Sequence, residues 1–124
     1  MSYELNLNDR PFQAIKTGTK KIEGRTPKDG ADLRYEKMSP GDFITFTNNT
    51  TNEKLICAVL SITHYPNVRS MLEAEGTQNV LSSGGNIEEG IESYHNLGGY
   101  KERIGKYGIY AIGVKPNKDQ TRQN

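Results

Sequence analysis

The segment from Gly18 to Arg25, here called the charged motif, places Lys20, Glu23 and Arg25 close together. If the motif is a strand, alternate side chains share a face, so Glu23 and Arg25 lie side by side. A carboxylate in that place can hold the planar guanidinium ready for a phosphate or a base edge. Lys20 faces the other way on a flat strand, so both cations can act together only on a curved strand or at a sheet edge. The alternative interpretation, a solvated surface strand with satisfied charges, stays open at this point.

Aromatic side chains that could stack on a base gather in the last third of the sequence. The chain has seven tyrosines and no tryptophan. We interpret Tyr94 and Tyr110 as core residues with their hydroxyls at the rim. Tyr100 and Tyr107 each lie between a glycine and a lysine and are better candidates for ligand contact. Basic residues interleaved with them could meet phosphates beside stacked bases: Lys101, Arg103 and Lys106.

The other reactive residue types favour structural roles. Neither His64 nor His95 has a neighbouring nucleophile or a metal partner in the sequence, so we interpret both as structural or rim residues. Cys57 lies in an apolar stretch and is expected to be a small core residue. The glycine-rich stretch 82–86 lacks the Gly-Lys-Ser/Thr of a phosphate loop, so we expect a flexible lid or a linker. No Cys/His cluster has zinc-ligand spacing, so we expect no metal and no cofactor.

The composition indicates one small domain with almost no net charge. The chain has 124 residues, of which 33% are apolar, and its 16 basic and 15 acidic residues give a formal charge of +1. This weak global field excludes a generic polyanion binder, so a nucleic-acid site must come from a local arrangement. The first ten residues hold no apolar signal core, and no segment has the length of a membrane span. We therefore expect a cytoplasmic protein without a membrane partner.

The segments around the charged motif predict the elements that position it. Alternating apolar residues predict a strand over 3–7, and the residues that follow predict a helix that begins near Asp9 and ends at Gly18. The motif itself is then expected to form a strand over about 20–25. Turn residues over 26–30 end that strand.

The remaining segments predict a sheet with helices packed on it. Their order lacks the regular strand-helix alternation of a doubly wound fold, so we predict an α+β fold with an antiparallel sheet or a small barrel. The segment 55–62 is apolar at successive positions and is expected to be a central strand buried on both faces. We expect residues 1–115 to form a single domain and residues 116–124 a disordered polar tail. Strands are expected at 43–47, 55–62 and 107–115, helices at 67–75 and 87–97, and a mobile loop at 77–86.

Several landmarks together resemble the ASCH domain family. The resemblance extends over most of the chain and implies a small PUA-like β-barrel, mixed or antiparallel, with flanking helices and a cleft lined by the charged motif. The landmarks are Gly18-x-Lys20-x-x-Glu23-x-Arg25 after a Pro11-Phe12-x-x-Ile15 helix, Gly41-Asp42-x-Ile44, Val59-x-x-Ile62-x-x-Tyr65 and Tyr107-Gly108-x-Tyr110-Ala111-Ile112.

The resemblance also implies a ligand. The family is associated with binding RNA or nucleotide-like ligands, and one branch hydrolyses the acetyl amide of N4-acetylcytidine. In that branch the motif lysine corresponds to Lys20, whereas the proposed nucleophile, a threonine, corresponds to Glu23 here. The branch also uses a glutamate from the downstream helical region, where this sequence offers Glu88, Glu89 and Glu92.

We therefore predict an RNA- or nucleotide-binding protein whose charged cleft uses Lys20, Glu23 and Arg25, with Tyr65 and Tyr107 as aromatic contacts. Lys20 and Arg25 are expected to contact a phosphate or a base edge, while Glu23 orients Arg25 or accepts from a base amine. Two catalytic alternatives stay open. One is an amidohydrolase for a nucleoside such as N4-acetylcytidine, with Lys20 as the base and Glu23 or a helical glutamate orienting water. The other is an RNA-cleaving member that uses the lysine and a tyrosine around the scissile phosphate.

Overall fold

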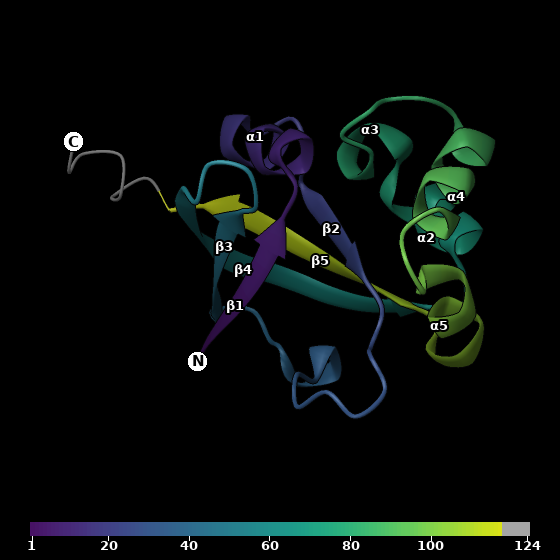
Figure 1. Ribbon diagram of the computed structural model, residues 1–124, viewed down its shortest axis with the longest axis horizontal. Helices are drawn as coiled ribbons and strands as arrows, with labels where there is room; N and C mark the ends of the chain where they lie inside the picture. The colour runs from purple at the N-terminus through teal and green to yellow at the C-terminus, as the bar shows by residue number, and fades with distance from the viewer. Residues whose placement is uncertain (118–124) are drawn as a thin grey trace.

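Five strands form one curled sheet at the centre of the computed structural model, which describes residues 1–117 (Figure 1). The strand order is β1-β3-β4-β5-β2, and β1 and β3 run parallel while the other neighbours are antiparallel. This mixed sheet forms a half-barrel with flanking helices, so the predicted α+β fold is confirmed. The strands are β1 (Ser2–Leu7), β2 (Ile22–Arg25), β3 (Phe43–Asn48), β4 (Lys54–Tyr65) and β5 (Ile109–Pro116).

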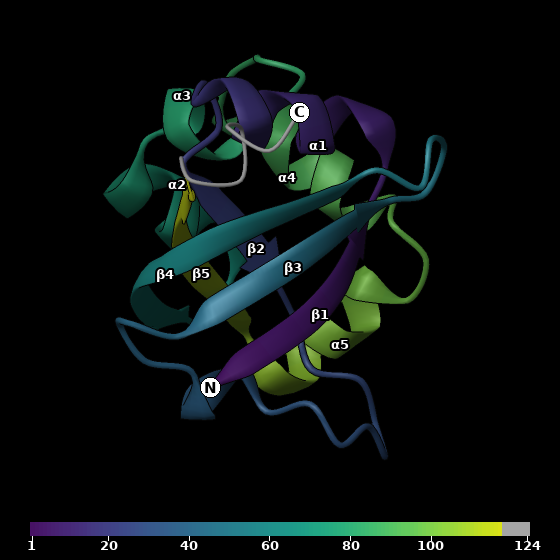
Figure 2. The same ribbon diagram turned by 90° about the vertical axis from the view of Figure 1, so that its left-hand side faces the viewer.

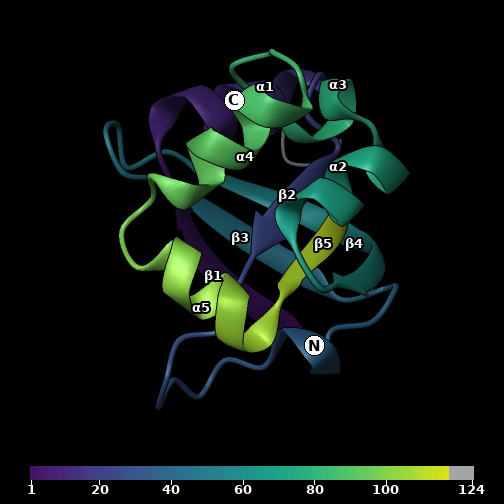
Figure 3. The ribbon, with the colours of Figure 1, turned by 90° about the vertical axis from the view of Figure 1, so that its right-hand side faces the viewer.

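All the helices except α1 gather on one side of the sheet, whereas α1 packs against the other face of β5. Figure 3 shows α2, α4 and α5 around β2 and β5, whereas the face of β1, β3 and β4 in Figure 2 carries no helix. Within residues 1–117, no helix has the length and apolar character needed to cross a membrane. The helices are α1 (Asp9–Thr17), α2 (Val68–Glu75), α3 (Thr77–Val80), α4 (Ile87–His95) and α5 (Tyr100–Tyr107), with a 3-10 turn at Tyr35–Lys37.

The strand buried on both faces is β5, not the segment 55–62 as the sequence predicted. In β4, Ile56 and Leu60 are exposed, because no helix covers the outer face of that strand. In β5, by contrast, Ala111 packs among the residues of the helical cluster, while Ile112 packs in the core of the half-barrel with α1. Therefore β5 joins the two apolar clusters of the domain.

The sequence prediction missed two helices. The segment 77–86, expected to be a mobile loop, contains α3, and α5 occupies residues before the last strand. Tyr100, Ile104 and Tyr107 of α5 do recur at helical spacing, but we interpreted the two tyrosines from the sequence as ligand contacts and overlooked this spacing. The last strand extends one residue beyond the predicted domain boundary, to Pro116. The rest of the predicted tail, residues 118–124, lies outside the described residues.

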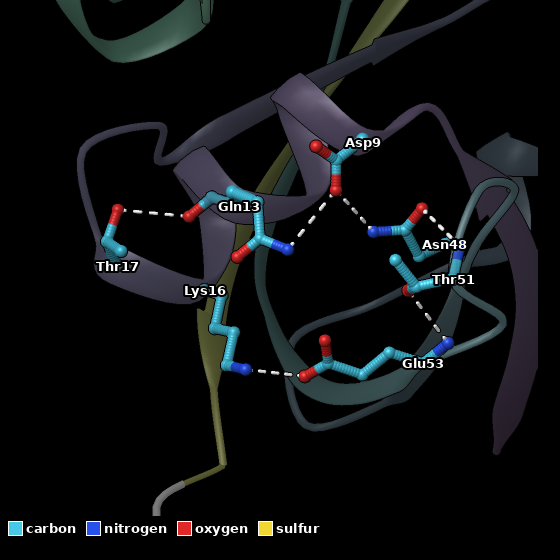
Figure 4. Close-up of polar contacts among 7 residues, drawn as sticks. All are labelled: Asp9, Gln13, Lys16, Thr17, Asn48, Thr51 and Glu53. Atoms are coloured by element: carbon cyan, nitrogen blue, oxygen red, sulfur yellow. Dashed lines mark hydrogen bonds and ion pairs between the residues drawn. The ribbon is translucent and has the colours of Figure 1, made fainter.

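A buried polar network ties α1 to the hairpin between β3 and β4 (Figure 4). The fully buried Asn48 donates from Nδ2 to Asp9 Oδ1 at 2.8 Å. Its Oδ1 accepts from the backbone N–H groups of Thr50 at 2.9 Å and Thr51 at 3.3 Å. Since α1 leads directly into the charged motif, this network fixes the point from which the motif starts.

Replacing Asn48 by alanine is expected to lower the free energy of unfolding by about 1–3 kcal/mol, because buried groups lose their partners. Urea unfolding of the parent and the variant measures the change. The matched control is Gln13→Ala, which removes only an exposed 3.3 Å bond to the same Asp9 oxygen. We expect this control to change stability by less than about 0.5 kcal/mol. Equal losses in the two variants would contradict the structural role of Asn48.

Candidate functional site

The charged motif begins where α1 ends and enters the sheet at its edge. Gly18 has a left-handed backbone with φ of 88°, and its N–H bonds to the Ile15 carbonyl, which ends the helix as predicted. The strand starts at Ile22, slightly later than expected. The reason is that the backbone N–H of Lys20 bonds to the Ala14 carbonyl and not to a neighbouring strand.

Three charged side chains of the motif converge at this edge. Arg25 donates from Nε to Glu23 Oε2 at 2.7 Å, the pairing that strand alternation predicts. Lys20 Nζ lies 3.5 Å from Glu23 Oε1, so each carboxylate oxygen faces a cation. The side chains of Lys20, Glu23 and Arg25 are 4%, 8% and 15% exposed. This burial excludes the alternative interpretation of the motif as a solvated surface strand.

Lys20 is held mainly by backbone carbonyl groups. Its ammonium donates to the Ile22 carbonyl at 2.7 Å and to the Val80 carbonyl. Burial lowers the pKa of Lys20, and the neighbouring Glu23 opposes this shift. The lysine therefore ties the end of α3 to β2, and most of its donors are already used within the protein.

Arg25 links the two ends of the sheet. Besides its bond to Glu23, its Nη2 donates to the backbone carbonyl of Asn6 in β1 at 2.6 Å. Burial acts to lower the pKa of Arg25, but Glu23 and the tyrosines Tyr100 and Tyr35 outweigh it and raise the pKa. The guanidinium is thus permanently charged and spans the gap between β2 and β1.

A cleft of about 650 Å³ opens over these charges. Its volume is in the range of pockets that hold small molecules. Its charged lining residues include the buried Lys20 and Glu23 and the partly buried Arg25, and Arg10 and Ser83 are among its exposed ones. The cleft therefore has a charged floor and a polar mouth.

Tyr94 lies against the floor of the cleft because residue 24 is a glycine. A Cβ atom at Gly24 would lie 2.6 Å from the Tyr94 hydroxyl, closer than real contacts allow. The Tyr94 ring stacks with Tyr100, with centroids 6.4 Å apart and planes at 26°, and both tyrosines line the cleft. Burial, followed by the nearby Glu23 charge, raises the pKa of Tyr94, so its phenol stays protonated.

The structure does not bring the two predicted aromatic contacts, Tyr65 and Tyr107, to this cleft. The Tyr65 hydroxyl donates to Glu75 at 2.5 Å, and the Tyr107 hydroxyl bonds to Asp29. Neither tyrosine is among the residues that line the cleft. Their predicted role in binding stays a prediction.

The three downstream glutamates also lie away from the cleft lining. Glu88 pairs with Arg69, and Glu89 caps its own helix. The cleft receives Tyr94 from that helix. The sequence interpretation of this residue as part of the core is confirmed, because Tyr94 is buried in the helical cluster, but its contact with the cleft was not predicted. Gly24 carried a usable signal, because a glycine within a strand often marks a close approach by another group.

The chain belongs to the ASCH domain family. The family model of the ASCH domain matches residues 5–118. The chain is similar to the crystal structure of the hypothetical protein PH0355, with 37% sequence identity and a TM-score of 0.79 over 94% of this chain and 100% of that chain. It is also similar to the solution NMR structure of protein PF0455 from Pyrococcus furiosus, with 36% identity and a TM-score of 0.70 over 94% and 97%. No curated protein matches the sequence.

Within residues 1–117, no three His, Cys, Asp or Glu side chains are grouped so that they could hold a metal ion. The arrangement can instead offer hydrogen-bond donors, acceptors and aromatic faces to an organic ligand.

Tyr94 is expected to make the stability of the protein fall at alkaline pH. Because its folded-state pKa is raised, the folded protein keeps a proton that the unfolded chain releases above about pH 10. The stabilising contribution is therefore complete below that pH and is lost as the pH rises, by up to about 1.4 kcal/mol per pH unit.

Chemical unfolding of the parent and of Tyr94→Phe at several alkaline pH values tests this expectation. The phenylalanine variant should lose stability less steeply, and the control Tyr3→Phe, on β1 outside the cleft lining, should follow the parent. Parallel curves for the parent and Tyr94→Phe would contradict the expectation.

Proposed function

We propose that this ASCH domain protein binds RNA, or a nucleotide-like ligand, in the cleft above the charged motif. The observation that carries the proposal is the convergence of Lys20, Glu23 and Arg25 at one buried floor beside the stacked pair Tyr94 and Tyr100. Association of the family with RNA binding supports the same ligand class. The cleft has room for a nucleoside, and aromatic faces and arginine are the groups on which single-stranded bases stack.

An exposed arginine at the mouth of the cleft could bind the phosphate of such a ligand. Arg10 is exposed and lines the cleft, and no described residue forms a hydrogen bond or ion pair with its side chain. A guanidinium in that state can bind a phosphate without breaking an existing contact. We therefore place the base toward the floor and the phosphate beside Arg10.

Arg10→Ala is expected to weaken binding of a short single-stranded RNA about tenfold, because one charge-assisted hydrogen bond to phosphate is lost. The slope of log affinity against log salt should also fall in magnitude by about one. Calorimetry at several salt concentrations measures both quantities. The substitution removes a cation from the first turn of α1, where a positive charge is unfavourable, so it should not lower the stability of the fold.

Arg34→Ala is the matched control, since Arg34 is exposed, lies outside the cleft lining and, among the described residues, its side chain pairs only with Glu36, across 3.3 Å. It should bind RNA as the parent does. Equal losses of RNA affinity in the two variants would contradict the position of the phosphate beside Arg10. Absence of RNA or nucleotide binding by the parent would overturn the proposal itself. The RNA should be recovered intact with metal chelated, whereas cleavage would favour the RNA-cleaving alternative.

A second candidate function, amide hydrolysis on a modified nucleoside, is favoured by one observation. Burial lowers the pKa of Lys20, and an amine with a lowered pKa is better suited to act as a general base. Against it, Glu23 stands where the corresponding family branch has its threonine, and Glu88, Glu89 and Glu92 are absent from the cleft lining.

Incubation of the protein with N4-acetylcytidine, followed by absorbance, tests this second candidate. We expect no deacetylation above that in buffer, because the cleft lacks the nucleophile of the family branch. Turnover that disappears in Lys20→Met would establish the hydrolase in place of a simple binding protein. Comparison of the melting temperatures of the variant and the parent shows whether the variant is folded.

A further inference from the structure

The Glu23 carboxylate retains acceptor capacity that faces the cleft. A carboxylate offers about four lone-pair sites. Arg25 Nε uses one of them at 2.7 Å, whereas Lys20 Nζ is at ion-pair distance, 3.5 Å, and gives its short bonds to backbone carbonyls. Glu23 is 6% exposed and lines the cleft. Its remaining lone pairs are therefore shielded from bulk water and open toward a bound ligand.

A hydrogen-bond donor lies beside this acceptor. Tyr94 is 8% exposed and lines the same cleft. It keeps its proton because burial and the Glu23 charge raise its pKa. The Gly24 backbone forms a hydrogen bond with its phenol that acts to lower the pKa, as expected when the phenol oxygen accepts from an N–H group. The phenol proton is then free to be donated to a ligand. The floor thus combines a carboxylate acceptor with a phenol donor.

We infer that this pair of groups makes the cleft selective for guanine, an inference that rests on the nucleotide-binding function proposed above. The Watson–Crick edge of guanine presents two adjacent donors, N1–H and the N2 amino group, followed by the acceptor O6. The two donors suit the Glu23 carboxylate, and O6 suits the phenol of Tyr94. The stacked ring of Tyr100 provides an aromatic face beside them.

The other bases match this floor less well. Adenine and cytosine turn a ring-nitrogen lone pair toward the position of the carboxylate, so two acceptors would face each other in a buried site. Uracil offers a single imino N–H between two carbonyl oxygens. A buried polar group left without a partner discriminates strongly against the wrong ligand, because the protein cannot replace the lost contact with water.

Calorimetric titration of the parent with the 5′-monophosphates of guanosine, adenosine, cytidine and uridine tests the inference. Guanosine monophosphate should bind at least about tenfold more tightly than adenosine or cytidine monophosphate, in line with the discrimination of a good bidentate pair. Inosine monophosphate, which lacks only the N2 amino group, should bind with intermediate affinity. This comparison uses the parent protein alone and does not depend on the folding of any variant.

Glu23→Gln is expected to reduce the preference for guanosine monophosphate to less than about threefold, because an amide of the same length both donates and accepts. Tyr94→Phe should weaken guanosine monophosphate binding while keeping the aromatic ring. Glu4→Gln, an exposed substitution on β1 outside the cleft lining, is the matched control and should keep the full preference.

The possible failures are distinguishable. Equal affinities for the four nucleotides would overturn guanine selectivity and leave the proposed binding function standing. A preference that survives in Glu23→Gln would overturn the role of Glu23. Absence of binding by all four nucleotides and by RNA would overturn the proposed function, and the selectivity with it.

Discussion

The hydrogen bonds of Arg25 hold together the two ends of a sheet that does not close by strand pairing. Through Nε and Nη2 the guanidinium joins Glu23 in β2 to the Asn6 carbonyl in β1, and these are the end strands of the sheet order. Because the guanidinium is largely buried, loss of either partner would leave its charge without that contact inside the protein, which is strongly unfavourable. Arg25 therefore bridges the two edges whose residues line the cleft.

The same constraint decides which motif residues remain available to a ligand. Lys20 looks from the sequence like a direct ligand contact, but its ammonium is committed to the carbonyls of Ile22 and Val80. In the binding mode that we propose, its effect on a ligand is therefore indirect, through the position and charge of Glu23. The groups with free capacity are Glu23 itself and the phenol of Tyr94, so the charged motif is part of the scaffold as well as the floor of the site.

How far the sequence could predict this arrangement depends on the range of each interaction. The helix end at Gly18 and the pairing of Glu23 with Arg25 are local, and residue type and strand alternation predict both. The bond from Arg25 to Asn6 depends on the curl of the whole sheet, and no local pattern reports it. The contact of Tyr94 with Gly24 likewise depends on how α4 packs on β2, so the sequence predicted the core position of this tyrosine correctly but not its contact with the cleft.

A nearly neutral domain can still select an anionic ligand if its charges are arranged locally. With a formal charge of +1, the chain has no field that would gather polyanions from a distance. Burial of Glu23 between two cations instead makes the floor intolerant of a mismatched group, because charged groups in such sites contribute more to specificity than to net affinity. In the binding mode that we propose, attraction of the phosphate is left to an exposed residue, Arg10, whose contribution salt can screen. Recognition of the base and attraction of the phosphate would then be separated between the floor and the mouth of one cleft, so each could change without loss of the other.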